Sequence, residues 1–171
     1  MLKPKIEQAL NDQINAELYS SYLYLSMAAW FEDQNLPGMA GWMQLQSREE
    51  YGHAMKFFGY VQERNSRVRL ARIDAPKLDW ESPLNVFEEA LAHEQYITDR
   101  IDQLVNLAVD EKDHATNNFL QWFVTEQVEE EATVTQIVDK LKVIGDNPVA
   151  RFMVDRELAQ RAPAPAGPAA G

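Results

Sequence analysis

Four long segments of this sequence carry apolar side chains at helical spacing, and only a few glycines and prolines interrupt them. Apolar residues that recur every three or four positions indicate one buried face of an α-helix. A first helix is predicted over about residues 4–34, and a second follows Asn35–Gly38 and reaches about residue 65. Ser82 and Pro83 suit the start of a third helix, which reaches about residue 112. A fourth helix follows to about residue 144, and a short fifth ends near residue 161.

The connections between these segments predict their arrangement. The breaks at Asn35–Gly38 and Asp113–His114 are short, so each joins antiparallel neighbours, whereas Ser66–Pro83 is long enough to cross the length of a bundle. We therefore predict an all-α protein, a four-helix bundle with one long crossover and a short fifth C-terminal helix. Residues 1–161 would form one domain, and residues 162–171, which are only Ala, Pro and Gly, a flexible tail.

One detail of the crossover is predicted separately. Val68, Leu70 and Ile73 alternate with polar or small residues, which indicates a short extended piece.

The charge and the residue content exclude several functions. A net charge of -11, from 27 acidic and 16 basic side chains, disfavours nucleic acid and anionic membranes and favours cations. The chain has no cysteine, so disulfides, thiolate metal sites and cysteine nucleophiles are excluded. The N-terminus lacks the apolar core of a signal peptide and no segment is apolar enough to cross a bilayer, so we expect a cytoplasmic protein.

Each long predicted helix carries one glutamate in the middle of its apolar face. These residues are Glu17, Glu50, Glu94 and Glu130. At about 100° per residue, each glutamate shares its helix face with apolar residues. Those expected beside Glu17 are Leu10, Ile14, Tyr24, Leu25 and Ala28, and those beside Glu50 are Met39, Met43, Ala54, Phe57 and Val61. Those expected beside Glu94 are Phe87, Ala90, Leu91, Ile97, Ile101 and Val105, and those beside Glu130 are Phe119, Phe123, Val134, Ile137 and Leu141. All four glutamates lie near mid-helix, so antiparallel packing can bring them together.

Bound cations explain such a cluster better than any arrangement without metal. An unpaired buried carboxylate costs several kcal/mol, so four of them would unfold a domain of ordinary stability. Two divalent ions would bring four positive charges against the four negative ones. Glu50 and His53 lie three residues apart on one helix face, and Gln127 and Glu130 repeat that spacing. Carboxylates with one imidazole and no sulfur suit iron or manganese, although zinc would also bind.

Three stretches of the sequence resemble the prokaryotic non-haem ferritins: Asn15–Ser20, Glu49–Ala54, and Asn118–Phe123 with Glu126–Glu131. The resemblance covers about residues 4–160. It implies a ferritin-like fold and an iron-storage protein that oxidises Fe(II) with dioxygen at a buried di-iron centre. It also implies that the ferric oxyhydroxide is stored inside a hollow shell of 24 identical subunits.

The resemblance assigns the ligands of this ferroxidase centre residue by residue. The first of two iron positions corresponds to Glu17, Glu50 and His53, and the second to the bridging Glu50 with Glu94 and Glu130, with Gln127 close by. A possible third iron position corresponds to Glu49, Glu126 and Glu129, with Glu130 shared. Tyr24 matches a tyrosine beside the irons.

Two related families fit less well. Bacterioferritins carry a second Glu-x-x-His on the fourth helix and a haem-ligating methionine after the second-helix glutamate, where this chain has Gln127–Glu130 and Tyr51. We therefore expect no haem. Rubrerythrins need a cysteine-ligated iron domain, which a chain without cysteine cannot form.

Several of these residues have a purely structural alternative. His53 alone could be a core histidine, and Tyr24 is either a core tyrosine or a hydrogen-bond partner and electron donor of the di-iron site. Glu49 and Glu129 could lie on a solvated helix flank. We expect His93 and His114 at the surface.

The first helix carries a second apolar stripe, formed by Tyr19, Leu23, Met27 and Trp30, nearly opposite Glu17. A helix that is apolar on both sides must be buried on both. We therefore expect a partner subunit over this stripe and a homo-oligomer.

Two other functions remain open from the sequence. A di-iron oxygenase or peroxidase would need an apolar substrate cavity and a reductase, and a structural bundle would bind no metal.

Overall fold

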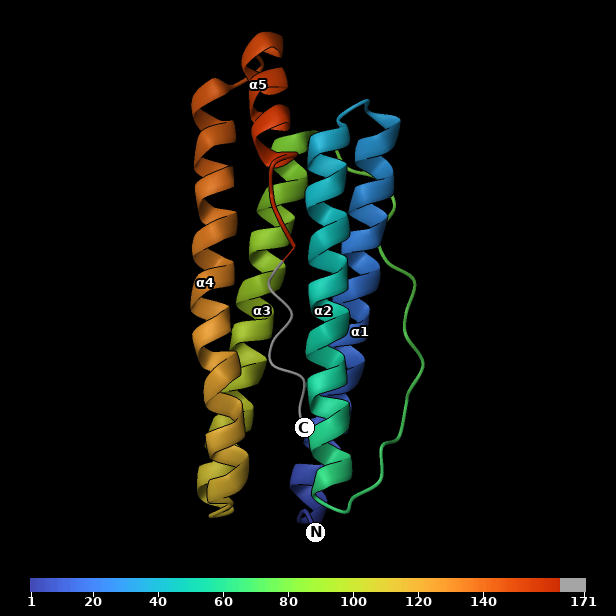
Figure 1. The fold of residues 1–171 in the computed structure, drawn as a ribbon, viewed down its shortest axis with the longest axis vertical. Coiled ribbons are helices and arrows are strands. Elements are labelled where there is room, and N and C mark those ends of the chain that lie inside the picture. The colour runs from blue at the N-terminus through green and yellow to red at the C-terminus, as the bar shows by residue number, and fades with distance from the viewer. Residues whose placement is uncertain (164–171) are drawn as a thin grey trace.

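The structure, a computed structural model, describes residues 1–163 and forms five helices. They are α1 (Pro4–Asp33), α2 (Pro37–Glu63), α3 (Pro83–Asp110), α4 (His114–Ile144) and α5 (Pro148–Leu158). Figure 1 shows the four long helices side by side, with α5 at the end of the bundle where α4 finishes. The predicted all-α bundle is confirmed, because these 163 residues contain no strand. None of the five helices is long and apolar enough to span a membrane.

The helix ends follow from local chemistry. Proline occupies the first turn of α1, α2, α3 and α5, where its missing N–H costs no hydrogen bond. The Ser82 hydroxyl caps α3 by accepting a hydrogen bond from the Asn85 N–H at 3.1 Å. Pro37 lies inside the predicted break, so α2 begins earlier than expected. The third helix ends two residues early, at Asp110, because Lys112 adopts a left-handed φ of 55°.

The fifth helix also ends before its predicted limit. It stops at Leu158, and the chain turns so that the Arg161 guanidinium reaches back to α2. Ala162 and Pro163 have no regular structure, and the rest of the predicted tail lies outside the described residues.

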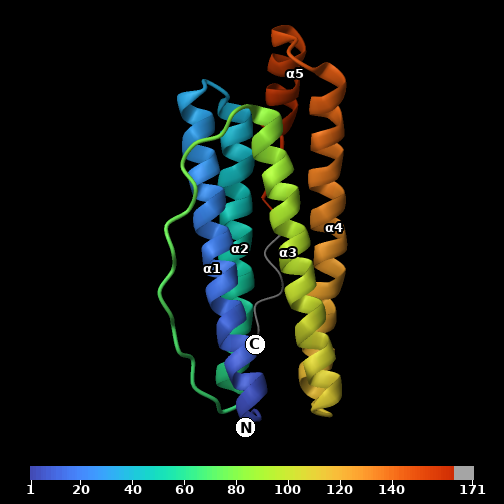
Figure 2. The same cartoon turned by 180° about the vertical axis from the view of Figure 1, so that it is seen from behind.

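The crossover between α2 and α3 runs the length of α1, so α2 and α3 are parallel (Figures 1 and 2). The predicted extended piece is not a strand, because α1 side chains bond the crossover backbone in place of a neighbouring strand. The Asn11 amide donates to the Arg67 carbonyl at 3.1 Å and accepts from the Arg69 N–H at 2.5 Å. The Asn15 amide donates to the Arg72 carbonyl at 3.1 Å.

The second apolar stripe of α1 is buried within a single chain. Leu23, Met27 and Trp30 are buried, and Trp80 of the crossover packs edge-on against Trp30 with ring centroids 6.2 Å apart. Our reason for expecting a partner subunit over this stripe was therefore wrong. Leu25, expected beside Glu17, is 51 % exposed and was also misplaced.

The core consists of two hydrophobic clusters, one towards each end of the bundle. On α1, one cluster contains Ile6, Leu10 and Ile14, and the other begins at Leu23. All four long helices contribute to both clusters. Between the clusters lies a band of buried polar side chains, which we call the polar layer: Glu17, Glu50, His53, Glu94, Gln127 and Glu130.

Candidate metal centre

The four predicted core glutamates are all buried. Glu17, Glu50 and Glu94 are each 1 % exposed, and Glu130 is 6 % exposed. Each comes from a different helix, and each lies between the two hydrophobic clusters because its neighbours one and two turns away are apolar. The burial predicted from helical periodicity is therefore confirmed.

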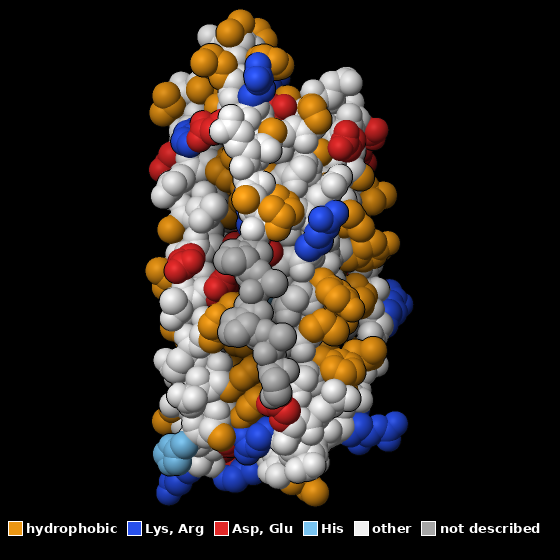
Figure 3. Space-filling model, in the orientation of Figure 1, with side chains coloured by type: hydrophobic (Ala, Val, Ile, Leu, Met, Phe, Trp, Pro, Cys, Tyr) orange, Lys and Arg blue, Asp and Glu red, His pale blue; other side chains and the backbone are white. Residues whose placement is uncertain are grey.

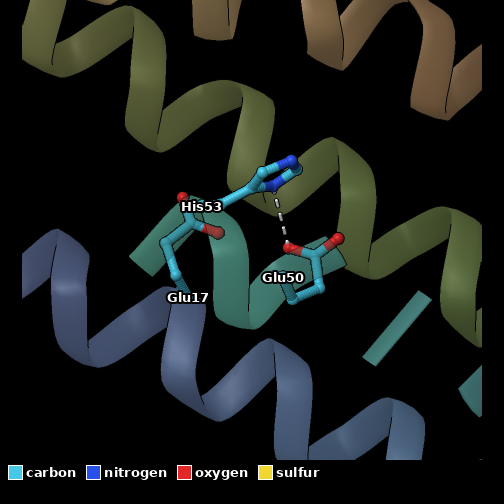
Figure 4. Close-up of side chains that lie close together, drawn as sticks. All are labelled: Glu17, Glu50 and His53. Carbon is cyan, nitrogen blue, oxygen red and sulfur yellow. Dashed lines mark ion pairs between the residues drawn. The ribbon is translucent and has the colours of Figure 1, made fainter. Parts of the chain in front are cut away.

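Glu17, Glu50 and His53 form a group that could hold a metal ion. Their ligand atoms all lie within 4.8 Å of one another, and His53 Nδ1 is 3.4 Å from Glu50 Oε2. Figure 4 shows the three side chains turned toward each other, Glu17 from α1 and the other two from α2. The His53 ring packs edge-on against Trp122, with centroids 5.4 Å apart, so its orientation is fixed by packing.

Glu94, on α3, lies between two donors. The Tyr24 hydroxyl donates to Glu94 Oε1, and the Gln127 amide donates to Glu94 Oε2 at 3.1 Å. The same amide reaches the Glu94 carbonyl at 3.2 Å and the Thr98 hydroxyl at 3.3 Å. Tyr24 and Gln127, both predicted at the site, thus contact the carboxylate of α3.

Two further glutamines donate into the polar layer, and the sequence analysis missed both. Gln13 Nε2 donates to Glu17 Oε1 at 2.8 Å, and Gln46 Nε2 donates to Glu50 Oε1 at 3.0 Å and Glu130 Oε2 at 2.8 Å. Each lies four residues before a core glutamate, on the same helix face, and this spacing was the signal that could have found them.

Each of these two amides is oriented by an arginine from outside the layer. Arg100 Nε donates to Gln13 Oε1 at 2.9 Å, and Arg161 Nη1 donates to Gln46 Oε1 at 2.9 Å. Because the amide oxygen accepts from the arginine, the NH2 group must face the carboxylates. No sequence spacing links these arginines to their partners.

The protein environment strongly disfavours negative charge in the metal-free polar layer. Burial, and next the neighbouring Glu50, raises the pKa of Glu17 from 4.5 to about 8. Burial likewise raises the pKa of Glu50 and Glu94 to about 8 and that of Glu130 to about 7. In each case the second cause is another of the four carboxylates, as expected for acids that converge.

One buried oxygen indicates what the layer could hold. Glu17 Oε2 is the single fully buried side-chain nitrogen or oxygen without a hydrogen-bond partner in residues 1–163. Buried polar atoms without partners are rare, and they call for a ligand that supplies one. A divalent cation would do so, and it would lower the pKa of the surrounding carboxyls. Carboxylate oxygens with one imidazole suit iron or manganese.

The residues predicted for a third position are only partly brought together. His53, Glu126 and Glu130 form a second group whose ligand atoms lie within 4.8 Å of one another. Glu49 is instead paired with Arg161 at 2.5 Å, and Glu129 is exposed. On the face seen in Figure 3, acidic side chains lie at mid-height between α4 and α2.

The two other histidines differ from each other. His114 is exposed, as predicted. His93 is half-buried, less exposed than predicted, because its Nε2 lies 2.7 Å from the Ser20 hydroxyl and Tyr19 and Tyr24 pack against its ring. Burial lowers the pKa of His93 from 6.5 to about 4.

Comparison with known proteins places the whole bundle in one group. Residues 7–144 match the family described as Ferritin-like domain. The chain is 45 % identical over 161 residues to a bacterial non-heme ferritin of Bacteroides fragilis (strain 638R), covering 94 % of this chain and 100 % of that one. It is 37 % identical over 159 residues to that of Escherichia coli O6:H1, covering 93 % and 96 %.

A solved structure agrees with these matches. It is that of an open pore ferritin from the archaeon Archaeoglobus fulgidus, with a TM-score of 0.94 and 50 % identity over 95 % of this chain and 99 % of that one.

Proposed function

This chain belongs to the ferritin family, among its prokaryotic non-haem members, and on that premise we propose that it is an iron-storage ferroxidase. It oxidises Fe(II) with dioxygen at a di-iron centre in the polar layer and stores the product as ferric oxyhydroxide. The observation that carries this proposal is the convergence of four buried glutamates from four helices, one of them with an unpartnered oxygen.

Fe(II) is the substrate, and the side chains hold two ions of it. Glu17 and His53 bind the first ion, Glu94 and Glu130 bind the second, and Glu50 bridges them. The raised pKa values mean that these carboxyls must release protons when Fe(II) enters. The two ions would give one electron each to one dioxygen molecule, which would take up two protons and leave as hydrogen peroxide. The ionised carboxylates would stabilise the greater charge of the two Fe(III) ions.

Neighbouring groups keep this geometry. The amides of Gln13, Gln46 and Gln127 hold the carboxylates in fixed directions, which is the role that partners of metal ligands generally have. Tyr24 donates a hydrogen bond to Glu94 and so positions the ligand of the second ion. Glu49, Glu126 and Glu129 would serve a third iron position, from which product leaves.

The remaining parts of the proposal concern assembly and location. The match to an open pore ferritin supports a homo-oligomeric shell, for which we propose 24 subunits and a cytoplasmic location. No haem is expected, since Tyr51 stands where a bacterioferritin has its axial methionine.

Aerobic addition of Fe(II) to the apo-protein tests the proposal, with absorbance and particle size measured together. A soluble ferric mineral inside a large particle supports it, and bulk precipitation opposes it. Glu50→Ala should abolish rapid oxidation, whereas Glu63→Ala, at an exposed position of the same helix, should leave it unchanged.

The same variants separate the two rivals. A metal-free bundle would gain stability in Glu50→Ala, and the unsubstituted protein would bind no cation. An oxygenase would consume dioxygen in proportion to an organic substrate and leave no mineral.

A further inference from the structure

Arg161 makes several contacts with α2 beside the polar layer. Its Nη1 donates to Gln46 Oε1 at 2.9 Å and to the Trp42 carbonyl at 3.3 Å, and its Nη2 pairs with Glu49 at 2.5 Å. Its guanidinium carbon lies 4.4 Å from the centroid of the Trp42 ring. The side chains of Arg161 and Glu49 are each only 20 % exposed. This is a guanidinium held on several sides, unlike an isolated surface ion pair.

The pairing places a positive charge beside the third position. Two candidate ligands of that position, Glu126 and Glu130, have ligand atoms within 4.8 Å of each other and of His53. Glu49 is not part of that group, and its carboxylate is bound to Arg161. Through Gln46, the guanidinium is also only one side chain away from Glu130.

We propose that Arg161 is a positioning residue that withholds Glu49 from the third cation position and so keeps that position weak. A cation there gains Glu49 as a ligand only when it displaces the guanidinium, because Glu49 must first give up its charge-assisted hydrogen bond to Arg161 Nη2 and the opposite charge. The two ions of the di-iron centre are affected less, because Arg161 reaches their ligands Glu50 and Glu130 only through the Gln46 amide. The inference rests on the proposed function of the polar layer as a cation site.

Titration of the assembled apo-protein with Co(II) tests the proposal without any oxidation step. Isothermal calorimetry counts the bound equivalents, and the visible absorption of Co(II) reports the ligands of each one. In Arg161→Gln, the third equivalent should bind about tenfold more tightly, the lower end of the effect expected from a change beside a metal ligand. Its absorption should also change, because Glu49 becomes a ligand. The affinity of the first two equivalents should change less than that of the third, because Arg161 acts on their ligands only through Gln46.

Three further variants complete the test. Arg156→Gln removes the same charge from an exposed position of α5 and should change none of the three equivalents. Arg161→Lys keeps a positive charge near Glu49 and should return the third affinity towards that of the unsubstituted protein. In the Glu49→Gln background, Arg161→Gln should have no effect on the third equivalent.

The failure of each idea would look different. If the unsubstituted protein binds no Co(II) in its first two equivalents, the proposed function fails. If those two bind and the third is equally weak with and without Arg161, the role of Arg161 is overturned. Equal loss of all three equivalents in Arg161→Gln would also overturn it, since that result indicates general damage to the fold.

Discussion

Replacing Glu17 with glutamine removes one buried ionisable carboxyl from the polar layer and keeps the size of the side chain. The Gln13 amide can still donate to the remaining side-chain oxygen, as it does to Glu17 Oε1 at 2.8 Å. The substitution therefore isolates the cost of ionising one buried carboxyl in the metal-free protein.

The cost follows from the pKa of Glu17, which burial raises from 4.5 to about 8. The folded protein holds this proton more tightly than the unfolded chain, so stability is greatest below pH 4.5 and falls as the pH rises to about 8. A tenfold change in proton affinity is worth about 1.4 kcal/mol, so the whole window costs about 5 kcal/mol. Most of this loss falls between pH 5 and pH 8.

Thermal unfolding of the apo-protein in chelator, at pH 5 and at pH 8, measures this effect. The unsubstituted protein should lose more stability between the two pH values than Glu17→Gln does, and the difference should be about 3–4 kcal/mol, since pH 5 to pH 8 covers only part of the window. Glu63→Gln, at an exposed position of α2, should follow the unsubstituted protein. Equal pH dependence in the Glu17→Gln variant and the unsubstituted protein would refute the argument that burial raises this pKa.

Three other outcomes are expected. Zn(II) at about a thousand times its dissociation constant should stabilise the protein by about 4 kcal/mol, seen as a higher unfolding temperature, and Glu50→Ala should remove most of that gain. Tyr24→Phe takes a donor from Glu94, so stability should fall by about 2 kcal/mol at pH 9 and by less at pH 5; an equal fall at both would contradict this. In Gly38→Ala the new Cβ would meet the Asp155 carbonyl oxygen at 1.8 Å, so the free energy of unfolding in denaturant should fall by about 1–3 kcal/mol or more. An unchanged free energy of unfolding would show that α5 does not pack on α2 at this point.

The sequence predicted those features of the fold and site that depend on helical periodicity. Glu17 and Glu94 could be placed in the core because their apolar neighbours recur every three or four residues, and burial follows from that pattern. The two short connections and the long crossover were predicted from a different local signal, the positions of proline, glycine and asparagine between the apolar segments.

Features that depend on contacts between distant segments could not be predicted. Trp80 lies in an irregular connection, so nothing in the local pattern indicated that it would help bury the second stripe of α1. The pairing of Glu49 with Arg161 joins residues 112 positions apart and depends on how the chain turns after α5. His93 is held by Ser20 of another helix, whereas its own helix suggested a surface position.

The polar layer separates two hydrophobic clusters that do not depend on iron. Local opening of the backbone should therefore be more frequent at the layer than in either cluster. Without cations, carboxyls of four helices face each other in this layer, and hydrogen bonds such as that from Gln46 to Glu130 link the helices where the hydrophobic clusters do not. Backbone amides nearest the layer should therefore exchange with deuterium faster than those at either end. Bound ions would slow that exchange at mid-bundle alone. Ions bound in the layer would then govern the resistance of each subunit to proteases as well as the oxidation of iron.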